Sequence, residues 1–186
     1  MPQILFTLIL LDAAALGYAF ILGLGLGDAA SISHHLLAGM LAAILILFTH
    51  VLIIFYLIGT GMDIREAVEG DEDQAKKYIP LTRRLKKRVF PWACFAILLI
   101  IVAALLGAEV HSRLIPGRGA GPGAEIALRQ VGGWWIHLAF VLLATGVNLA
   151  AFTVEFMAVS SNRKAIEEIN FAAEEEPAAE TGKAQT

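Results

Sequence analysis

Three polar side chains interrupt long apolar segments of this sequence at similar depths. Asp12, His50 and Asn148 lie in three different apolar segments, each roughly 12–16 Å from the same membrane face at a rise of about 1.5 Å per residue. Ionisable groups at membrane depth are rare and commonly mark a functional or paired network. Because a carboxylate can orient an imidazole and an amide can both donate and accept, we predict a buried polar network in which Asp12 orients His50.

The last apolar segment presents a polar stripe. At about 100° per residue, His137, Asn148 and Glu155 deviate from alignment by only about 20° per step, so they share one helix face. We therefore add Glu155 to the predicted network. Two alternatives stay open. The network serves only as polar contacts between helices, or Glu155 lies at the membrane interface and pairs with Arg163 or Lys164.

A second group of polar residues gathers at the opposite ends of the apolar segments. They are His34 and His35 before the second segment, Glu109 and His111 after the third, and His137 in the fourth. Axial histidines from facing helices commonly hold haem inside a helical bundle. We predict His35 and His137 as axial ligands of one b-type haem, with His111 as a substitute for either. The alternative is a small metal site. Its ligands would be His34, His35, Glu109 and His111.

The amino-acid composition indicates whether these residues lie in a soluble protein or in a membrane protein. Of the 186 residues, 58% are hydrophobic and 17% are charged, whereas a soluble domain has about 45–50% apolar and about 25% charged residues. The chain has one cysteine and a formal net charge of −3. These values exclude a disordered chain, a disulfide scaffold and a basic nucleic-acid-binding protein. A membrane protein remains, with the lipid bilayer as its first partner.

Four apolar segments are close to the length of about 20 residues that crosses a bilayer as a helix. They are residues 4–26, 36–58, 89–108 and 134–159. We therefore predict an all-α integral membrane protein, a bundle of four transmembrane helices within a single domain, residues 1–170. The acidic, alanine-rich tail 171–186 is expected to be disordered by itself.

The connections predict how the bundle is oriented. The connection 62–88 carries eight Lys and Arg residues, whereas 109–133 carries three. Because basic connections stay on the cytoplasmic side, we place 62–88 in the cytoplasm and 109–133 in the periplasm. Both termini are then cytoplasmic, in a bacterial-type inner membrane.

The organisation resembles the small four-helix membrane cytochrome b and anchor subunits of respiratory complexes. The resemblance covers about residues 30–160 and depends on short hydrophilic connections, cytoplasmic ends and histidines at helix ends. It implies a membrane subunit that works with partner subunits, and it does not transfer ligand identities.

From these features we expect a subunit of a respiratory or photosynthetic electron-transfer complex that carries one b-type haem near the periplasmic face. Its expected partners are other membrane subunits, with quinone as a further candidate and no nucleic acid. The small extramembrane portion leaves no room for independent catalysis. One alternative is a haem-free accessory subunit. A second is a proton or ion pathway through Asp12, His50 and Asn148.

Overall fold

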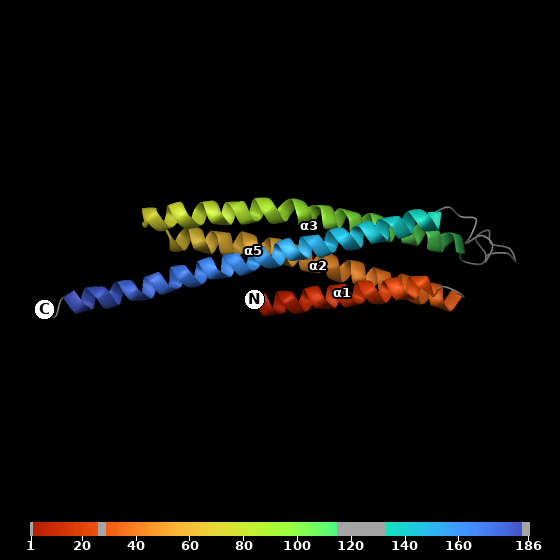
Figure 1. Cartoon of the computed structure of the whole chain (residues 1–186), viewed down its shortest axis with the longest axis horizontal. Coiled ribbons are helices and arrows are strands. Elements are labelled where there is room, and N and C mark those ends of the chain that lie inside the picture. The colour runs from red at the N-terminus through yellow and green to blue at the C-terminus, as the bar shows by residue number, and fades with distance from the viewer. Residues whose placement is uncertain (1, 26–28, 115–132, 184–186) are drawn as a thin grey trace.

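The computed structural model describes residues 2–25, 29–114 and 133–183. The described chain forms the helices α1 (Pro2–Leu24), α2 (Ala29–Ala67), α3 (Glu72–Leu114) and α5 (Gly133–Lys183), which lie side by side along one long axis (Figure 1). Each of these helices includes an apolar stretch long enough to cross a membrane. The predicted all-helical architecture with four potential membrane spans is confirmed.

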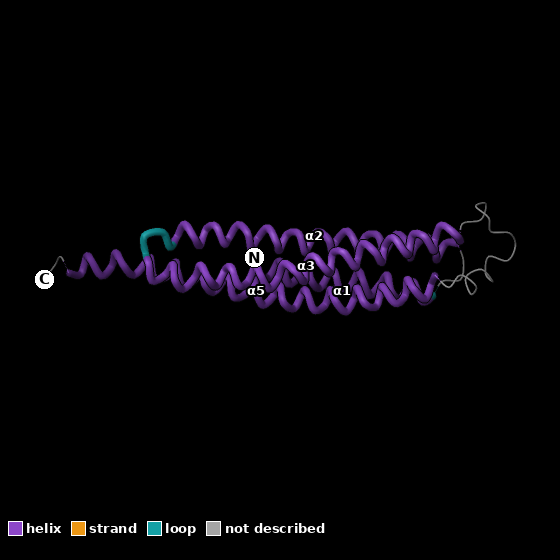
Figure 2. The backbone as a smooth tube through the Cα atoms, turned by 90° about the horizontal axis from the view of Figure 1, so that it is seen from above, coloured by secondary structure: helices purple, strands orange, loops and turns teal. Residues whose placement is uncertain are grey.

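The helices contact one another as neighbours around a bundle. α2 packs against α1 and α3, and α5 packs against α3 and α1. α2 also meets α5 across the bundle, which brings the polar residues of these two helices together. α1 begins about midway along the molecule, so beyond its first residue only α2, α3 and α5 continue (Figures 1 and 2). We call this three-helix extension, residues 61–84 and 162–172, the stalk.

The stalk replaces most of the predicted connection 62–88. α2 continues to Ala67 and α3 begins at Glu72, so only residues 68–71 join them. The apolar residues in this region recur at helical spacing and form a small core of their own. That core consists of Ile64, Val68, Tyr78, Ala165 and Ile169. Burial of these side chains against α5 extends the helices beyond the predicted spans.

The turn between α2 and α3 depends on two residues. Gly70 has a φ of 95°, in the left-handed region that glycine adopts without a steric cost. The Asp71 carboxylate then accepts hydrogen bonds from the backbone N–H groups of Asp73 and Gln74, at 3.0 and 2.9 Å. This is the arrangement of a helix N-cap, and it starts α3. These hydrogen bonds, chiefly that from Gln74, lower the pKa of Asp71.

In the acidic tail, α5 continues through residues 171–183. Alanine and glutamate are strong helix formers, and both are abundant in this tail.

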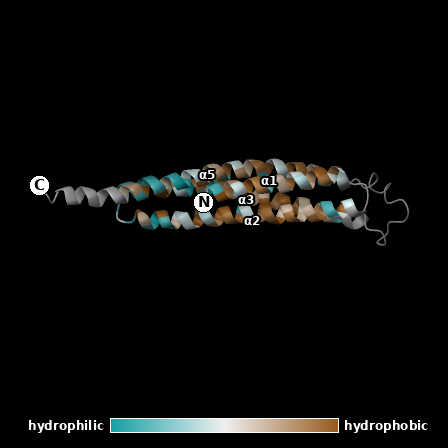
Figure 3. Cartoon of the chain, turned by 90° about the horizontal axis from the view of Figure 1, so that it is seen from below, coloured by the Kyte–Doolittle hydropathy of each residue, from teal (hydrophilic) through white to brown (hydrophobic). Residues whose placement is uncertain are grey.

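The surface of the four-helix part is apolar, whereas the stalk is hydrophilic (Figure 3). Large side chains such as Ile21, Leu24 and Phe55 are 67%, 71% and 68% exposed. A contiguous apolar surface of this extent is what a bilayer covers. The polar residues of the four-helix part must therefore be sought inside it.

Candidate functional site

The centre of the bundle holds a histidine bound on both sides by α5. The Nδ1 atom of His50 on α2 lies 2.7 Å from a carboxylate oxygen of Glu155, and its Nε2 lies 2.9 Å from the side-chain oxygen of Asn148. The ring of Phe152 stacks on the imidazole, with centroids 4.8 Å apart. Asn148 and Glu155 are two helical turns apart on one face, so a single imidazole reaches both. The shared face predicted for them is confirmed.

These hydrogen bonds constrain the protonation state of His50. The side-chain nitrogen of Asn148 donates to the Ala144 carbonyl at 2.7 Å, so its oxygen must face the imidazole. The amide oxygen of Asn148 accepts, so Nε2 of His50 carries a proton. When Glu155 is ionised, Nδ1 carries a second proton and donates it to the carboxylate; a protonated Glu155 would instead donate its own proton to Nδ1. A histidine that donates through both nitrogens is an imidazolium. With Glu155 ionised, His50 and Glu155 form an ion pair with no exposed side-chain surface.

The prediction that Asp12 orients His50 is wrong, because Glu155 occupies that position. Asp12 and Thr49 are fully buried beside the ion pair, yet neither carboxylate oxygen of Asp12 nor the hydroxyl oxygen of Thr49 has a hydrogen-bond partner among the described residues. The alternative interfacial pairing of Glu155 is also wrong. Arg163 instead pairs with Glu167, four residues further along α5, at 2.6 Å.

A second histidine arrangement lies toward the other end of the bundle. His35 on α2 and His137 on α5 face each other with ring centroids 6.3 Å apart and ring planes at 75°. The Nδ1–H of His35 donates to the Ala19 carbonyl of α1 at 2.9 Å. A carbonyl only accepts, so this contact places the proton on Nδ1 and leaves the lone pair on Nε2.

Each of these imidazoles fits against a glycine of a neighbouring helix. A Cβ atom at Gly23 of α1 would lie 2.9 Å from Cε1 of His35, and a Cβ at Gly107 of α3 would lie 2.8 Å from Cε1 of His137. Real Cβ atoms essentially never approach so closely. The two imidazole rings can therefore occupy these positions only because residues 23 and 107 are glycines.

The two histidine environments repeat each other in part. Gly23 follows Ala19 by four residues, and Gly107 follows Ala103 by four residues. The hydrogen bond to a backbone carbonyl is present at His35, whereas Nδ1 of His137 has no hydrogen bond within the described residues. The pairs α1–α2 and α3–α5 thus share the close contact between an imidazole and a glycine.

Of the other predicted ligands, the structure describes the side chain of His34 and not that of His111. His34 is exposed on α2, and the side chain of His111 lies outside the residues whose surroundings are described. Within the part of the chain that is described, no group of three or more His, Cys, Asp or Glu side chains is placed to hold a metal ion. The alternative metal site therefore stays a prediction.

An apolar layer separates the two polar arrangements. His137 and Asn148 are roughly 16 Å apart along α5 at about 1.5 Å per residue. The side chains of Ile46, Leu99, Ile100 and Ala144 belong to one buried cluster in this part of the bundle. Two distinct polar sites, rather than one continuous polar path, occupy the described interior.

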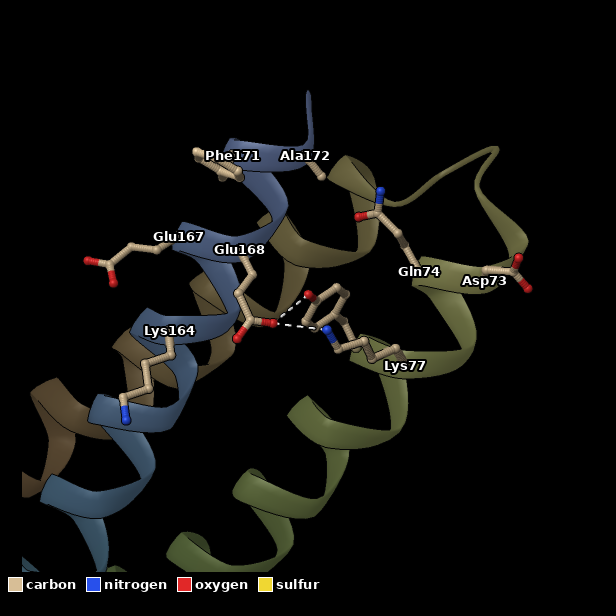
Figure 4. Close-up of a pocket in the computed structure, with 9 residues that line it drawn as sticks. Asp73, Gln74, Lys77, Lys164, Glu167, Glu168, Phe171 and Ala172 are labelled. Carbon is tan, nitrogen blue, oxygen red and sulfur yellow. Dashed lines mark hydrogen bonds and ion pairs between the residues drawn. The ribbon is translucent and has the colours of Figure 1, made fainter. Parts of the chain in front are cut away.

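A groove on the stalk is lined by residues of α3 and α5 (Figure 4). Lys77 and Tyr78 both donate to one carboxylate oxygen of Glu168, at 3.0 and 2.8 Å. These contacts, Lys77 first and Tyr78 second, lower the pKa of Glu168. Both members of the ion pair are more than half exposed, and surface pairs contribute little free energy. We interpret this contact as one that holds α3 and α5 together at the surface of the stalk.

Several residues of these sites escaped the sequence-based prediction. Thr49 and Phe152 adjoin predicted members, but a threonine or phenylalanine inside an apolar segment carries no distinctive signal. Gly107 carries one, because it follows Ala103 by four residues and lies near the same end of the apolar segments as the predicted histidine pair. The sequence also predicts Gly23 as a close-packing position, and the structure places it against His35. No family model, curated protein or solved structure matches the chain. Function is therefore inferred from the geometry of the two sites.

Proposed function

We propose that this protein is a small membrane subunit of an electron-transfer complex and that it binds one b-type haem between His35 and His137. The observation that carries the proposal is the 6.3 Å separation of the two ring centroids. With metal–nitrogen bonds of about 2.0–2.1 Å and the ring radius added on each side, two axial imidazoles on one metal have centroids about 6 Å apart. The spacing therefore suits two ligands of one iron.

The surroundings of the pair support ligation. Metal-binding histidines usually donate their other ring N–H to a carbonyl or carboxylate, which fixes the tautomer, and His35 does so to Ala19. Gly23 and Gly107 keep the imidazoles close to the neighbouring helices. His50 lacks these features because both of its nitrogens are already engaged. A bound haem would supply a one-electron carrier whose potential depends on its axial ligands and the apolar surroundings.

The rest of the proposal concerns the setting of this site. The basic residues of the connection 62–88 lie largely on and beside the stalk, and basic segments favour the cytoplasmic side. We place the stalk and both termini in the cytoplasm of a bacterial-type inner membrane and the histidine pair near the periplasmic face. Electrons then need a partner on that face, either another subunit or a quinone in the bilayer.

The absorption spectrum of the purified full-length protein tests this proposal. A reduced-minus-oxidised spectrum should show the α-band of a b-type haem, and His35→Ala and His137→Ala should each abolish it. The matched control is His34→Ala, because His34 is the exposed neighbour of His35. A band that survives both ligand variants refutes the assignment of ligands. A folded protein without any band, after growth with sufficient haem, favours the haem-free accessory subunit.

A further inference from the structure

We propose that Asp12, His50 and Glu155 form a buried proton-binding site that holds an exchangeable proton on Asp12. The proposal does not depend on haem binding, because it concerns the separate arrangement at the centre of the bundle. The three side chains are fully buried and come from α1, α2 and α5, so their charges can be counted together.

The hydrogen-bond inventory shows what the cluster lacks. The two ring nitrogens of His50 are engaged by Glu155 and Asn148, so it has no donor left for Asp12. Four oxygens, two on Asp12 and one each on Thr49 and Glu155, have no partner among the described residues. Carboxylate oxygens only accept, so an ionised Asp12 finds at most the Thr49 hydroxyl as a donor. A proton on Asp12 supplies the donor that the cluster lacks.

The charge balance of the cluster also indicates that Asp12 is protonated. The pair of His50 and Glu155 is neutral overall, whether its proton lies on the imidazole or on the carboxyl group, so an ionised Asp12 would leave one net negative charge in the apolar interior. An unpaired buried charge is costly, and the group commonly neutralises itself instead. The buried residues of α3 from Val89 to Ala103 are apolar, so α3 offers no counter-charge. Asp12 with its proton makes the cluster neutral.

A metal cation fits the same oxygens poorly. Hard cations take six or more oxygen ligands, whereas three side chains supply the free oxygens of this cluster. The backbone carbonyls of α1, α2 and α5 at this depth belong to continuous helices, where each already accepts a helical hydrogen bond, so the three side chains are the main oxygen source. A proton needs only one oxygen to hold it and one to accept its hydrogen bond.

Infrared spectroscopy of the full-length protein in lipid nanodiscs tests the proposal. At pH 7 an ordinary aspartate is ionised, since its pKa is about 3.9. We expect instead a C=O stretching band of a protonated carboxylic acid at pH 7. The band should disappear at alkaline pH as Asp12 releases its proton to the solvent, and it should be absent from Asp12→Asn at pH 7, where ordinary carboxyl groups are ionised. The control Glu167→Gln changes an exposed carboxylate of α5 and should leave the band in place.

Nitrogen-15 NMR of histidine-labelled protein supplies a second measurement that needs no change at Asp12. The resonances of His50, assigned by their loss in His50→Gln, should show both ring nitrogens protonated at pH 7. A neutral tautomer of His50 overturns the proposal, and so does a missing carboxylic acid band or a band that persists in Asp12→Asn. These results are independent of the haem spectrum, so either proposal can fail without the other.

Discussion

Replacing Gly107 with alanine tests whether the position of His137 depends on the missing side chain of α3. The new Cβ would lie 2.8 Å from Cε1 and 3.3 Å from Nε2 of the imidazole, whereas ordinary contact begins at 3.4 Å. The ring must therefore retreat by about 0.6 Å, or the two helices must separate by that amount. Binding sites tolerate about 0.5 Å of displacement, so haem occupancy should fall as well.

The free energy of this change has two opposing parts. Overpacking of a closely packed interior costs about 1–3 kcal/mol. Alanine recovers up to about 1 kcal/mol over glycine inside a helix. Gly146→Ala on α5 is the matched control, because nothing lies within 4 Å of its added Cβ and only the favourable part applies. The two variants should thus differ in the free energy of unfolding by about 1–3 kcal/mol.

The same comparison can be made on α1, where Gly23 faces His35 and Gly17 has open space. The assay is denaturant or thermal unfolding of the purified protein in detergent, followed by circular dichroism, with the haem spectrum recorded in parallel. Gly23→Ala and Gly107→Ala should each be less stable than their control. If all four variants unfold together and keep the same spectrum, the glycines do not position the histidines.

Three further predictions concern other parts of the molecule. Glu155→Gln removes the counter-charge of the buried His50 imidazolium and should lower the free energy of unfolding by about 3–5 kcal/mol, measured by the same assay. Gly70→Ala places a side chain at a φ of 95° and should destabilise the protein by about 1–2 kcal/mol, whereas Gly59→Ala meets no atom within 4 Å and should not; equal melting temperatures would contradict this. The lowered pKa of Glu168 predicts that its contacts stabilise the stalk above the ordinary pKa of 4.5 and that this contribution is lost as the pH falls below it. The melting temperatures of wild type and Glu168→Gln should therefore converge in acid, and a difference that is constant with pH would contradict the assignment.

The four spans could be predicted from the sequence because a continuous apolar segment of about 20 residues is typical of a membrane-spanning helix. The stalk could not, because its charges dominate the connection 62–88 and its apolar residues are few. Ile64, Val68 and Tyr78 acquire a partner only when α5 continues past the membrane to bring Ala165 and Ile169 alongside. That contact joins residues almost a hundred positions apart, and local periodicity does not report it.

Depth and angle were sufficient to predict which residues of the central site are buried, but not which of them touch. Rise per residue placed Asp12, His50 and Asn148 at one level, and helical angle placed Asn148 and Glu155 on one face. Neither quantity says that α2 meets α5 across the bundle. Given that contact, Glu155 reaches Nδ1 of His50 and displaces Asp12 from the role it was predicted to have.

The histidines of the bundle interior differ in what their nitrogens can still do. Both ring nitrogens of His50 are engaged by side chains of α5, so no lone pair is left for a metal, and with an ionised Glu155 the imidazole carries a positive charge. His35 donates only through Nδ1 to a carbonyl, which leaves Nε2 as an electron-pair donor across from His137. Residue type alone does not separate these roles, since all three are histidines inside apolar helices. The hydrogen-bond partners distinguish the two roles. His50 is held by a carboxyl group and an amide, which engage both ring nitrogens. His35 is held by one carbonyl and packs against a glycine, which leaves one ring nitrogen available as a ligand.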